Sequence, residues 1–430
     1  MKFYLVSLGC AKNLVDSEKI TEHLYRAGYQ ITDRIEEASL VFINTCGFIA
    51  DAKKESIETI FSLLQEKPKN AGIVIFGCLV QRYREELERL IPEVDLFLPI
   101  LPYEDFAKEI KKRFPSRHEP CHTLHNNILF TPPSYTYIKI AEGCRNCCSY
   151  CTIPLIRGTL KSLSPDDIVR QIKDSLKKGV YEINLIAQDL TAYGKDRRGK
   201  NSLESLLLKV LSLKKDFWIR LLYLYPSRIS QTLVKIIRSD SRIAKYIDMP
   251  VQHVNGRILK LMNRSYTREI IEKKIEMVRA KIPDMAFRTT LMVGFPTESE
   301  EEFQELADFV NRIKFDHLGV FEYSPEEDTS AFLLKPRVPA HVKRKRRRKL
   351  MDIQKGLVRE KNTALTGRTY PCLIELPVDE YGAVWTGRLY SQAPEVDGIV
   401  YVTGYNASMG KVVTIRITGF KDYDFFGECV

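Results

Sequence analysis

The sequence has no apolar run long enough to cross a membrane, because no stretch approaches the roughly 18 apolar residues that a spanning helix needs. It also lacks the apolar core of a secretory leader. Such a core takes roughly 7–15 residues behind a positively charged region, whereas the run near the start covers only residues 3–8. We therefore expect a cytoplasmic protein without a membrane span, and a buried strand at residues 2–8.

A disulfide framework is lacking as well, because ten cysteines in 430 residues are sparse outside one short cluster. A reducing compartment fits this usage and leaves thiolates available for metal. The length predicts two or three domains. Lys and Arg outnumber Asp and Glu by 66 to 55, and the net charge of +11 suits a polyanionic partner such as RNA.

The densest cysteine cluster has the spacing C-x3-C-x2-C, formed by Cys144, Cys148 and Cys151. Three thiolates can hold three irons of a 4Fe-4S cluster and leave the fourth iron open. The spacing resembles that of radical S-adenosylmethionine enzymes, where an aromatic residue commonly precedes the third cysteine, as Tyr150 does here. Cys147 permits the register C-x2-C-x3-C, and Tyr150 favours Cys148. A zinc knuckle, with Cys147 as the fourth ligand, is the alternative.

A second group of cysteines follows three predicted strands. Strands at residues 2–8, 40–44 and 73–76 alternate with helices at 13–28, 52–65 and 82–91, which indicates a parallel sheet with helices on both faces. Cys10, Cys46 and Cys78 each come just after a strand, and ligands in such folds gather at the carboxyl ends of the strands. The pattern predicts a second metal site. Three buried, inert cysteines are the alternative.

The middle of the chain predicts a six-stranded partial TIM barrel, whose chemistry lies at the C-terminal mouth of the strands. Ser164 before Pro165, and Thr297 with Glu300, are expected to start two of the helices. His253 ends a strand and is given no function. The expected strands are residues 135–141, 182–187, 218–225, 246–249, 287–293 and 317–323, and helices are expected at 165–178, 267–281 and 300–313.

The remaining segments are a linker, a basic run and a β-rich tail. Residues 113–133 hold four prolines and are expected to form a linker, in which Cys121 and His122 receive no function. The basic run at residues 343–349 predicts either a solvated helix face or an RNA or ribosome contact. Short strands at residues 372–376, 383–390, 398–403 and 412–419 predict a small closed antiparallel barrel of the OB kind, which binds nucleic acid or protein.

With these features in view, the chain resembles the radical S-adenosylmethionine methylthiotransferases along its whole length. The resemblance implies an N-terminal methylthiotransferase domain at residues 1–114, a radical-SAM core at 130–360 and a TRAM domain at 363–430. It is carried by motifs at Ser7–Cys10 with Lys12 and Asn13, Asp16–Glu18, Asn44–Phe48, Gly77–Tyr83, the cysteine triad, Ile153 and Pro154 with Arg157 and Gly158, Ala187–Asp189 and Val293–Pro296.

Within that family the chain is most similar to the RimO branch, which adds a methylthio group to the β-carbon of an aspartate in ribosomal protein S-twelve. Ala11-Lys12-Asn13 stands where the tRNA branch usually has Gln-Met-Asn, and the tRNA activity on isopentenyladenosine is the alternative. A non-catalytic zinc-bearing RNA or ribosome binder is the third hypothesis. One departure is Thr297, where the family usually has glycine, which puts the local backbone shape in doubt.

The resemblance also implies cofactors, ligands and partners. The cofactors are S-adenosyl-L-methionine and two 4Fe-4S clusters, with an electron donor such as flavodoxin or ferredoxin. The acidic residues Glu395 and Asp397 of the tail are expected to face the basic ribosomal protein of the small subunit. The implied cluster ligands are Cys144, Cys148 and Cys151 for the first cluster and Cys10, Cys46 and Cys78 for the second, and the implied cofactor contacts are Gln188, Asp189 and Tyr150.

Overall fold

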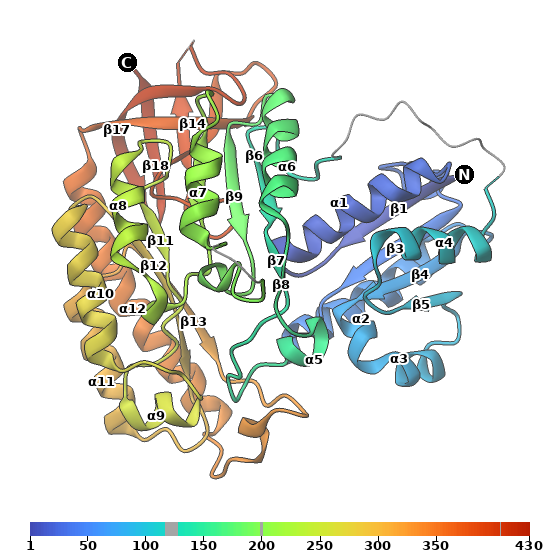
Figure 1. Ribbon diagram of the computed structural model, residues 1–430, viewed down its shortest axis with the longest axis horizontal. Coiled ribbons are helices and arrows are strands. Elements are labelled where there is room, and N and C mark those ends of the chain that lie inside the picture. The colour runs from blue at the N-terminus through green and yellow to red at the C-terminus, as the bar shows by residue number, and fades with distance from the viewer. Residues whose placement is uncertain (117–127, 198–200, 405) are drawn as a thin grey trace. The chain divides into compact units, whose positions relative to one another are not determined.

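The computed structural model describes residues 1–116, 128–197, 201–404 and 406–430 (Figure 1). The chain forms two compact units. The first consists of Met1–Phe130, Glu142–Cys144 and Cys151–Thr159, and the second of Thr131–Ala141, Arg145–Tyr150 and Leu160–Val430. Cys121, His122 and most of the predicted linker lie outside the described residues. Within the described ranges, no helix combines the length and apolarity that crossing a membrane requires.

The first unit contains a five-stranded parallel sheet in the order β2-β1-β3-β4-β5. The three predicted strands are confirmed as β1 (Lys2–Ser7), β3 (Leu40–Thr45) and β4 (Gly72–Gly77). Two edge strands, β2 (Gln30–Ile31) and β5 (Leu96–Leu98), were not predicted. They have two and three residues, too few to show a periodic pattern.

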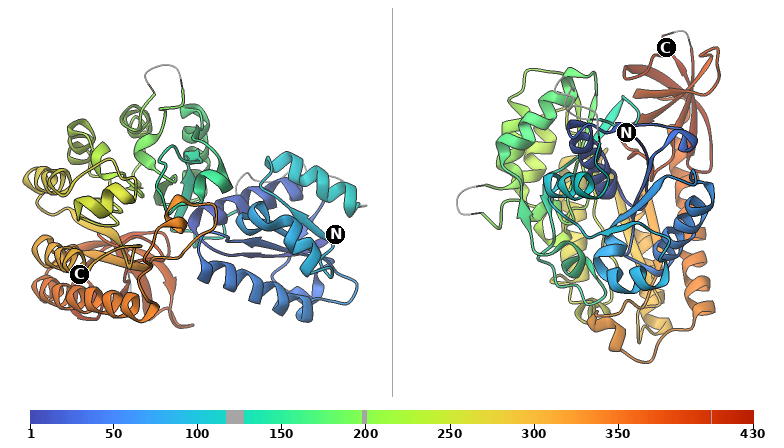
Figure 2. Two further views of the ribbon diagram at one scale, coloured as in Figure 1. Left: turned by 90° about the horizontal axis from the view of Figure 1, so that it is seen from below. Right: turned by 90° about the vertical axis from the view of Figure 1, so that its right-hand side faces the viewer.

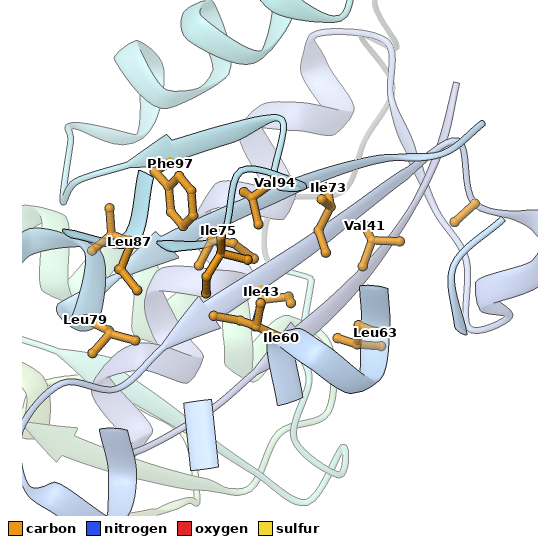
Figure 3. Close-up of a cluster of buried hydrophobic side chains, with 13 residues drawn as sticks. Val41, Ile43, Ile60, Leu63, Ile73, Ile75, Leu79, Leu87, Val94 and Phe97 are labelled. Carbon is orange, nitrogen blue, oxygen red and sulfur yellow. The ribbon is translucent and has the colours of Figure 1, made fainter. Parts of the chain in front are cut away.

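Helices cover both faces of this sheet, as the two views of Figure 2 show. On one face, α1 (Ala11–Arg26) and α4 (Tyr103–Arg113) pack on a cluster that includes Phe42 and Phe106. On the other face lie α2 (Ala50–Glu66) and α3 (Cys78–Leu90). Figure 3 shows the side chains of that second cluster, among them Val41, Ile43, Ile60, Ile73, Ile75 and Leu87. Burial on both faces explains why the central strands are continuously apolar.

The second unit contains six parallel strands of a partial barrel, as predicted. Two three-stranded sheets, β10-β9-β6 and β11-β12-β13, are connected by an isolated bridge between Ile219 and Ile243. The strands are β6 (Tyr135–Lys139), β9 (Glu182–Ile186), β10 (Trp218–Leu221), β11 (Tyr246–Asp248), β12 (Ala286–Val293) and β13 (His317–Glu322). The helices that alternate with or follow these strands are α6 (Pro165–Lys177), α7 (Leu203–Leu211), α8 (Gln231–Ser239), α9 (Gly256–Leu261), α10 (Arg268–Lys281), α11 (Glu300–Ile313) and α12 (Ala340–Leu365).

Both helices begin at the predicted residue, Pro165 and Glu300, but only one of the two predicted capping residues is confirmed. The Ser164 side chain accepts a hydrogen bond from the Asp167 backbone and caps α6. Helix α11 begins after Ser299, which forms a capping box with Glu302, and not at Thr297. Thr297 has a backbone φ of 69°, a left-handed conformation, whereas Ser299 has the extended backbone that an N-cap residue requires.

The tail forms a closed five-stranded barrel in the order β14-β15-β16-β18-β17. Four of its strand pairs are antiparallel, as predicted, and the pair β16–β18 is parallel because these strands are connected through β17. The last strand was not predicted. The strands are β14 (Thr369–Pro377), β15 (Val384–Leu389), β16 (Val400–Thr403), β17 (Val412–Lys421) and β18 (Asp424–Cys429).

A buried ion network joins this small barrel to the large one. Arg388 of β15 donates to Glu182 at the start of β9 over 2.6 Å, and Arg220 of β10 donates to the other oxygen of Glu182 over 2.6 Å. Arg388 also pairs with Glu375 of β14 at 2.8 Å. Both arginines and Glu182 are almost completely buried. Buried charges need close partners, so these residues hold the two barrels together.

The acidic run near Asp397 belongs to the same junction. Asp397 accepts hydrogen bonds from Arg288 at 2.8 Å and Tyr246 at 2.7 Å, and its side chain is only 1% exposed. The expectation that Asp397 faces a basic ribosomal protein is therefore wrong, because its charge is already compensated inside the protein. Glu395 is exposed, but its carboxylate accepts a hydrogen bond from Tyr135 at 3.0 Å.

Candidate functional site

The structure brings Cys10, Cys46 and Cys78 to one edge of the first sheet; we call them the N-terminal cysteine group. Cys10 is the N-cap residue of α1, Cys46 follows β3 directly, and Cys78 is the first residue of α3 after β4. All three therefore lie at the carboxyl ends of adjacent parallel strands. Cys10 is exposed, Cys46 is half-buried and Cys78 is buried.

Two glycines beside these cysteines allow the strand ends to approach closely. Gly9 has a φ of +92°, and a Cβ atom there would lie 2.8 Å from Cys46 Cβ. Gly77 has a φ of +100°, and a Cβ atom there would lie 2.3 Å from Asn44 Oδ1. Both positions combine a left-handed backbone with too little space for a side chain, so the geometry requires glycine.

Side-chain amides fix the same strand ends. Asn13 Nδ2 donates to the Leu8 carbonyl at 2.9 Å and to the Thr45 carbonyl at 3.2 Å, which ties the end of β1 to the end of β3. Asn44 Nδ2 donates to the Asn13 carbonyl at 2.8 Å and to Ser17 Oγ at 2.9 Å. The polar motif residues of the first unit thus orient the backbone that carries the cysteines.

Burial affects the protonation of two thiols in this group. Burial, with the nearby Cys78 and Cys10 thiols adding to it, raises the pKa of Cys46 to about 12. Burial also raises the pKa of Cys78. These thiols are therefore neutral by themselves, and a coordinated metal would deprotonate them. Among the described residues, no three Cys, His, Asp or Glu side chains lie close enough to bind one metal ion directly. A cubane cluster has a different requirement, because its irons lie between the thiolates.

A buried arginine completes the group. Arg157, at the end of the short helix α5 (Ile153–Arg157), donates to Cys78 Sγ at 3.2 Å and to Asn13 Oδ1 at 2.7 Å. Its other terminal nitrogen donates to Asp16 Oδ2 at 2.5 Å, and Asp16 also accepts a hydrogen bond from Tyr103 at 2.9 Å. The positive charge of the guanidinium is therefore balanced by Asp16.

The other three predicted cluster ligands lie in the segment Cys144–Cys151, which we call the cysteine loop. Cys144 and Cys151 belong to the first compact unit and Cys148 to the second. Cys144 N donates to the Gly158 carbonyl at 3.1 Å, which fixes the start of the loop. Ser149 N donates to the Met262 carbonyl at 3.1 Å, and the Ser149 carbonyl accepts from Ala331 N at 2.8 Å.

The two adjacent cysteines of this loop differ in their surroundings. Cys148 is half-buried, and its sulfur accepts a hydrogen bond from Arg264 Nη1 at 3.5 Å. Cys147 is exposed, and its sulfur lies 3.8 Å from the carbonyl of Arg145. The Cys147 backbone carbonyl accepts from Asn263 Nδ2 at 2.6 Å, so this residue is held through its main chain. These contacts favour Cys148 over Cys147 as a metal ligand.

Asp189, a predicted cofactor contact, is engaged by protein donors. It pairs with Arg228, accepts from Asn146 Nδ2 at 2.8 Å and accepts from Thr191 Oγ1 at 2.5 Å. Arg228 also donates to Asn146 Oδ1 at 2.7 Å. In this structure Asp189 therefore anchors the cysteine loop through Asn146, and its contact with the cofactor stays a prediction. Gln188, its neighbour, is half-buried after the end of β9.

Tyr150 packs against an apolar cluster at the mouth of the large barrel. The cluster contains Ile258, Met262, Phe295 and Tyr323, which come from α9 and from the ends of β12 and β13. Burial by these side chains fixes the residue before Cys151. The contact of Tyr150 with the cofactor stays a prediction.

The backbone at Thr297 keeps the shape that glycine would give. Thr297 has a φ of 69°, and its amide donates to the Pro336 carbonyl at 2.9 Å. Arg257 donates to the Thr297 hydroxyl at 3.0 Å and to its carbonyl at 2.8 Å. These bonds hold a β-branched residue in a conformation that is strained for it. The departure from the family pattern therefore leaves the turn in place.

His253 lies in the core behind the strand ends. It is fully buried, and Nδ1 accepts from the Asn255 amide at 3.0 Å, while no described residue bonds to Nε2. Burial lowers the pKa of His253 to about 3. The imidazole is therefore neutral at physiological pH.

The basic run of α12 is only partly a solvated face. Lys343 donates to the Tyr323 carbonyl at 2.7 Å, and the buried Arg346 pairs with Glu298 at 3.2 Å and Glu300 at 3.0 Å. These contacts attach α12 to α11 and to the turn after β12. The exposed cations of the run are Arg344, Lys345, Arg347, Arg348 and Lys349.

Sequence reasoning missed the roles of Arg157 and Arg264, although Arg157 belongs to a motif that carries the resemblance. Both side chains donate to a cysteine sulfur in a buried setting. The signal for Arg157 was an arginine that directly follows the apolar run Ile153–Ile156, where a charged residue needs a buried partner. The partner of Arg157 is Asp16, which lies far away in the sequence, and hydrophobic periodicity does not indicate such distant pairs.

Three segments of the chain match known families. Residues 2–99 match the uncharacterized protein family UPF0004, residues 138–310 the Radical SAM superfamily, and residues 366–430 the TRAM domain.

Relatives match over the whole chain. The ribosomal protein uS12 methylthiotransferase RimO of Acetivibrio thermocellus is 41% identical, with 100% of this chain and 98% of the relative covered. The protein of the same name from Aquifex aeolicus is 44% identical, with 100% and 97% covered. That from Thermodesulfovibrio yellowstonii is 43% identical, with 100% and 99% covered.

Two solved structures share the fold. The radical S-adenosylmethionine methyltransferase TsrM from Kitasatospora setae has a TM-score of 0.55 and 13% identity, with 75% of this chain and 76% of that chain covered. The cobalamin-dependent S-adenosylmethionine radical enzyme OxsB has a TM-score of 0.52 and 14% identity, with 84% and 56% covered. At these identities the likeness concerns the fold alone.

Proposed function

Since the chain belongs to the ribosomal protein uS12 methylthiotransferase (RimO) family, we propose that it is a radical-SAM methylthiotransferase that modifies this ribosomal protein. The product is a methylthio group on the β-carbon of an aspartate. The observation that carries the proposal is the full-length likeness to these relatives, at 41% to 44% identity. The tRNA activity, which would use the same chemistry, is the outcome against which the proposal is tested.

The six cysteines would hold two 4Fe-4S clusters. Cys144, Cys148 and Cys151 of the cysteine loop would hold the cluster that binds S-adenosyl-L-methionine. The N-terminal cysteine group, Cys10, Cys46 and Cys78, would hold the second, auxiliary cluster. When bound, these groups supply the one-electron chemistry that replaces a hydrogen on an unactivated carbon with sulfur, which no side-chain base can do. The position of these three cysteines at the carboxyl ends of adjacent strands supports the second assignment.

The protein's own residues position these groups and keep water out. Arg264 and Arg157 each direct hydrogen-bond donors at one cysteine sulfur, and Asp189 holds the cysteine loop through Asn146. Tyr150 and the apolar cluster around Met262 exclude water from the base of the loop. Fixed donors around a reactive group favour reaction because they need no rearrangement when charge moves.

Further partners belong to the same proposal. The exposed cations of α12 and the TRAM barrel are candidate contacts for ribosomal RNA, which binds through Lys and Arg. A low-potential electron donor such as flavodoxin or ferredoxin would supply the electrons. Because its substrate is a ribosomal protein, we expect the enzyme to act in the cytoplasm.

The decisive test is anaerobic reconstitution with iron and sulfide, followed by assay of both candidate substrates. Mass spectrometry should detect a methylthio group on the ribosomal protein and none on tRNA. Replacing Cys144, Cys148 and Cys151 together with alanine should halve the iron content and abolish cleavage of S-adenosylmethionine. Methylthiolated tRNA, or cofactor cleavage by the triple variant, would overturn the proposal.

A further inference from the structure

Arg157 is a buried cation that bonds to one cysteine of the N-terminal cysteine group. Its side chain is 3% exposed, and it bonds to Cys78 Sγ at 3.2 Å and to Asp16 Oδ2 at 2.5 Å. Burying a guanidinium is costly unless every bond is well made. A simple counter-ion for Asp16 would not need a second bond to a sulfur atom. The bond to Cys78 therefore indicates a role for Arg157 beyond that of a counter-ion for Asp16.

The position of Arg157 in the chain adds a second observation. It lies six residues after Cys151, and its guanidinium also pairs with Glu142 at 3.4 Å, two residues before Cys144. Segments on both sides of the cysteine loop thus meet at one guanidinium, within the first compact unit. The same guanidinium bonds to a thiol of the N-terminal cysteine group.

We propose that Arg157 is a positioning residue of the auxiliary cluster, an inference that rests on the function proposed above. Its N–H group fixes the orientation of Cys78 and donates to the ligand sulfur. Hydrogen bonds to cluster sulfurs and nearby charge both set the reduction potential of an iron–sulfur cluster. Arg157 thereby favours the reduced state, and Asp16 opposes it.

The sign of each effect follows from the charge that the cluster gains. A low-potential reductant adds one electron, so the reduced cluster is more negative by one charge. Loss of the Arg157 cation and its N–H donor makes that state less favourable and lowers the potential. Loss of the Asp16 carboxylate, with Arg157 kept in place, raises the potential. Opposite shifts from two adjacent residues are not expected from a merely structural role.

The experiment uses the full chain with Cys144, Cys148 and Cys151 replaced by alanine, so that the auxiliary cluster is the only one. Three variants are made in this background: Arg157→Gln, Asp16→Asn, and both together. Dithionite titration under argon, followed by electron paramagnetic resonance, gives the midpoint potential. We expect Arg157→Gln to shift the oxidised-to-reduced ratio at least tenfold toward the oxidised form, about 59 mV for one electron. Asp16→Asn should shift it in the opposite direction.

Arg82→Gln is the matched control. Arg82 is half-buried near the same group and donates to the Gly47 carbonyl at 2.9 Å, beside Cys46. This variant removes a cation beside the group but leaves the bond between Arg157 and Cys78 Sγ intact, so its midpoint should fall by less than that of Arg157→Gln.

Each outcome has one meaning. If the triple-alanine parent binds no iron, the auxiliary cluster is absent and the proposed function fails. If it binds iron and neither variant shifts the midpoint, the role of Arg157 is refuted while the proposed function stands. If the single variant Arg157→Gln loses its iron, the midpoint of the double variant tests the role of Arg157 instead. The double variant has no buried carboxylate at position 16 that would be left without a counter-ion. A double variant with the parent's midpoint would likewise refute a special role for the N–H donor to sulfur.

Discussion

The guanidinium of Arg264 donates to the sulfur of Cys148 at 3.5 Å and not to that of its neighbour Cys147. The same guanidinium contacts the rings of Tyr225 and Tyr266, at 4.6 Å and 4.9 Å from their centroids, and donates to the Pro250 carbonyl at 2.6 Å. Four contacts therefore fix its position. A rigid donor aimed at one of two adjacent cysteines distinguishes them more clearly than their spacing in the sequence does.

The first prediction concerns these two cysteines. Cys147→Ser should keep full iron content and activity, because the Cys147 sulfur is exposed and lies only near a carbonyl group. Cys148→Ser should lose the cluster of the cysteine loop, and with it about half of the iron. Iron analysis and release of 5′-deoxyadenosine after reconstitution provide the measurements. The reverse pattern would move the ligand register by one residue.

The second prediction concerns the left-handed backbone at Thr297. Thr297→Gly should be more stable than Thr297→Ala by about 1 kcal/mol, because only glycine adopts a positive φ without strain. Both variants lack the hydroxyl that Arg257 contacts, so this loss cancels. The melting temperatures should differ by about 2 °C. The same pair of substitutions at Thr329, where φ is −99°, should give the opposite order. Equal melting temperatures at position 297 would contradict the strain.

The third prediction concerns acid sensitivity from His253. Its pKa is lowered to about 3 by burial, so the unfolded chain binds a proton below pH 6.5 that the folded chain does not. The stability contribution is present above pH 6.5 and is lost as the pH falls toward 3. Between pH 7 and pH 5 the loss should be about 2 kcal/mol. His253→Gln should remove it, so its melting temperature should fall less than that of the wild type over this range. Parallel pH profiles would show that His253 titrates normally.

The fourth prediction concerns the junction of the two barrels. Arg388→Met leaves Glu182 and Glu375 without one of their buried donors and should cost about 3–5 kcal/mol. Faster proteolysis of residues 366–368, between α12 and β14, would report the loosened barrel. Arg416→Met is the control, because Arg416 and Glu428 form an exposed pair that should contribute less than about 1 kcal/mol. If both variants are cleaved at the wild-type rate, the buried network does not hold the junction.

The sequence predicted those parts of the fold that repeat. Strands β1, β3 and β4 and all six strands of the large barrel are apolar runs bounded by helices, so periodicity is enough to find them. Strands β2 and β5 were missed because short edge strands receive their structure from a neighbour and not from their own pattern. The start of α11 at Glu300 was predicted correctly, but its cap was assigned to Thr297 in place of Ser299, because capping depends on a backbone conformation that Thr297 does not have.

The residues of the candidate site were likewise predicted only in part. The cysteines are rare residues at regular places in the pattern, so the sequence alone singled them out. The residues that surround them are ordinary ones whose role depends on distant partners. Asp397 was interpreted as a surface charge because it forms an acidic run with Glu395, yet Arg288 and Tyr246, more than a hundred residues away, donate hydrogen bonds to it. Long-range pairing of this kind carries no local signal.

The ion network between Glu182, Arg220 and Arg388 also limits how freely this architecture can be recombined. A TRAM barrel taken from another protein would bring its own residue to position 388, and a residue without a donor there would leave Glu182 buried beside one arginine. Domain exchange would therefore succeed only if the residues at position 182 of β9 and position 220 of β10 were exchanged together with the tail. The two barrels therefore have to be exchanged as one unit, although the chain connects them only through α12.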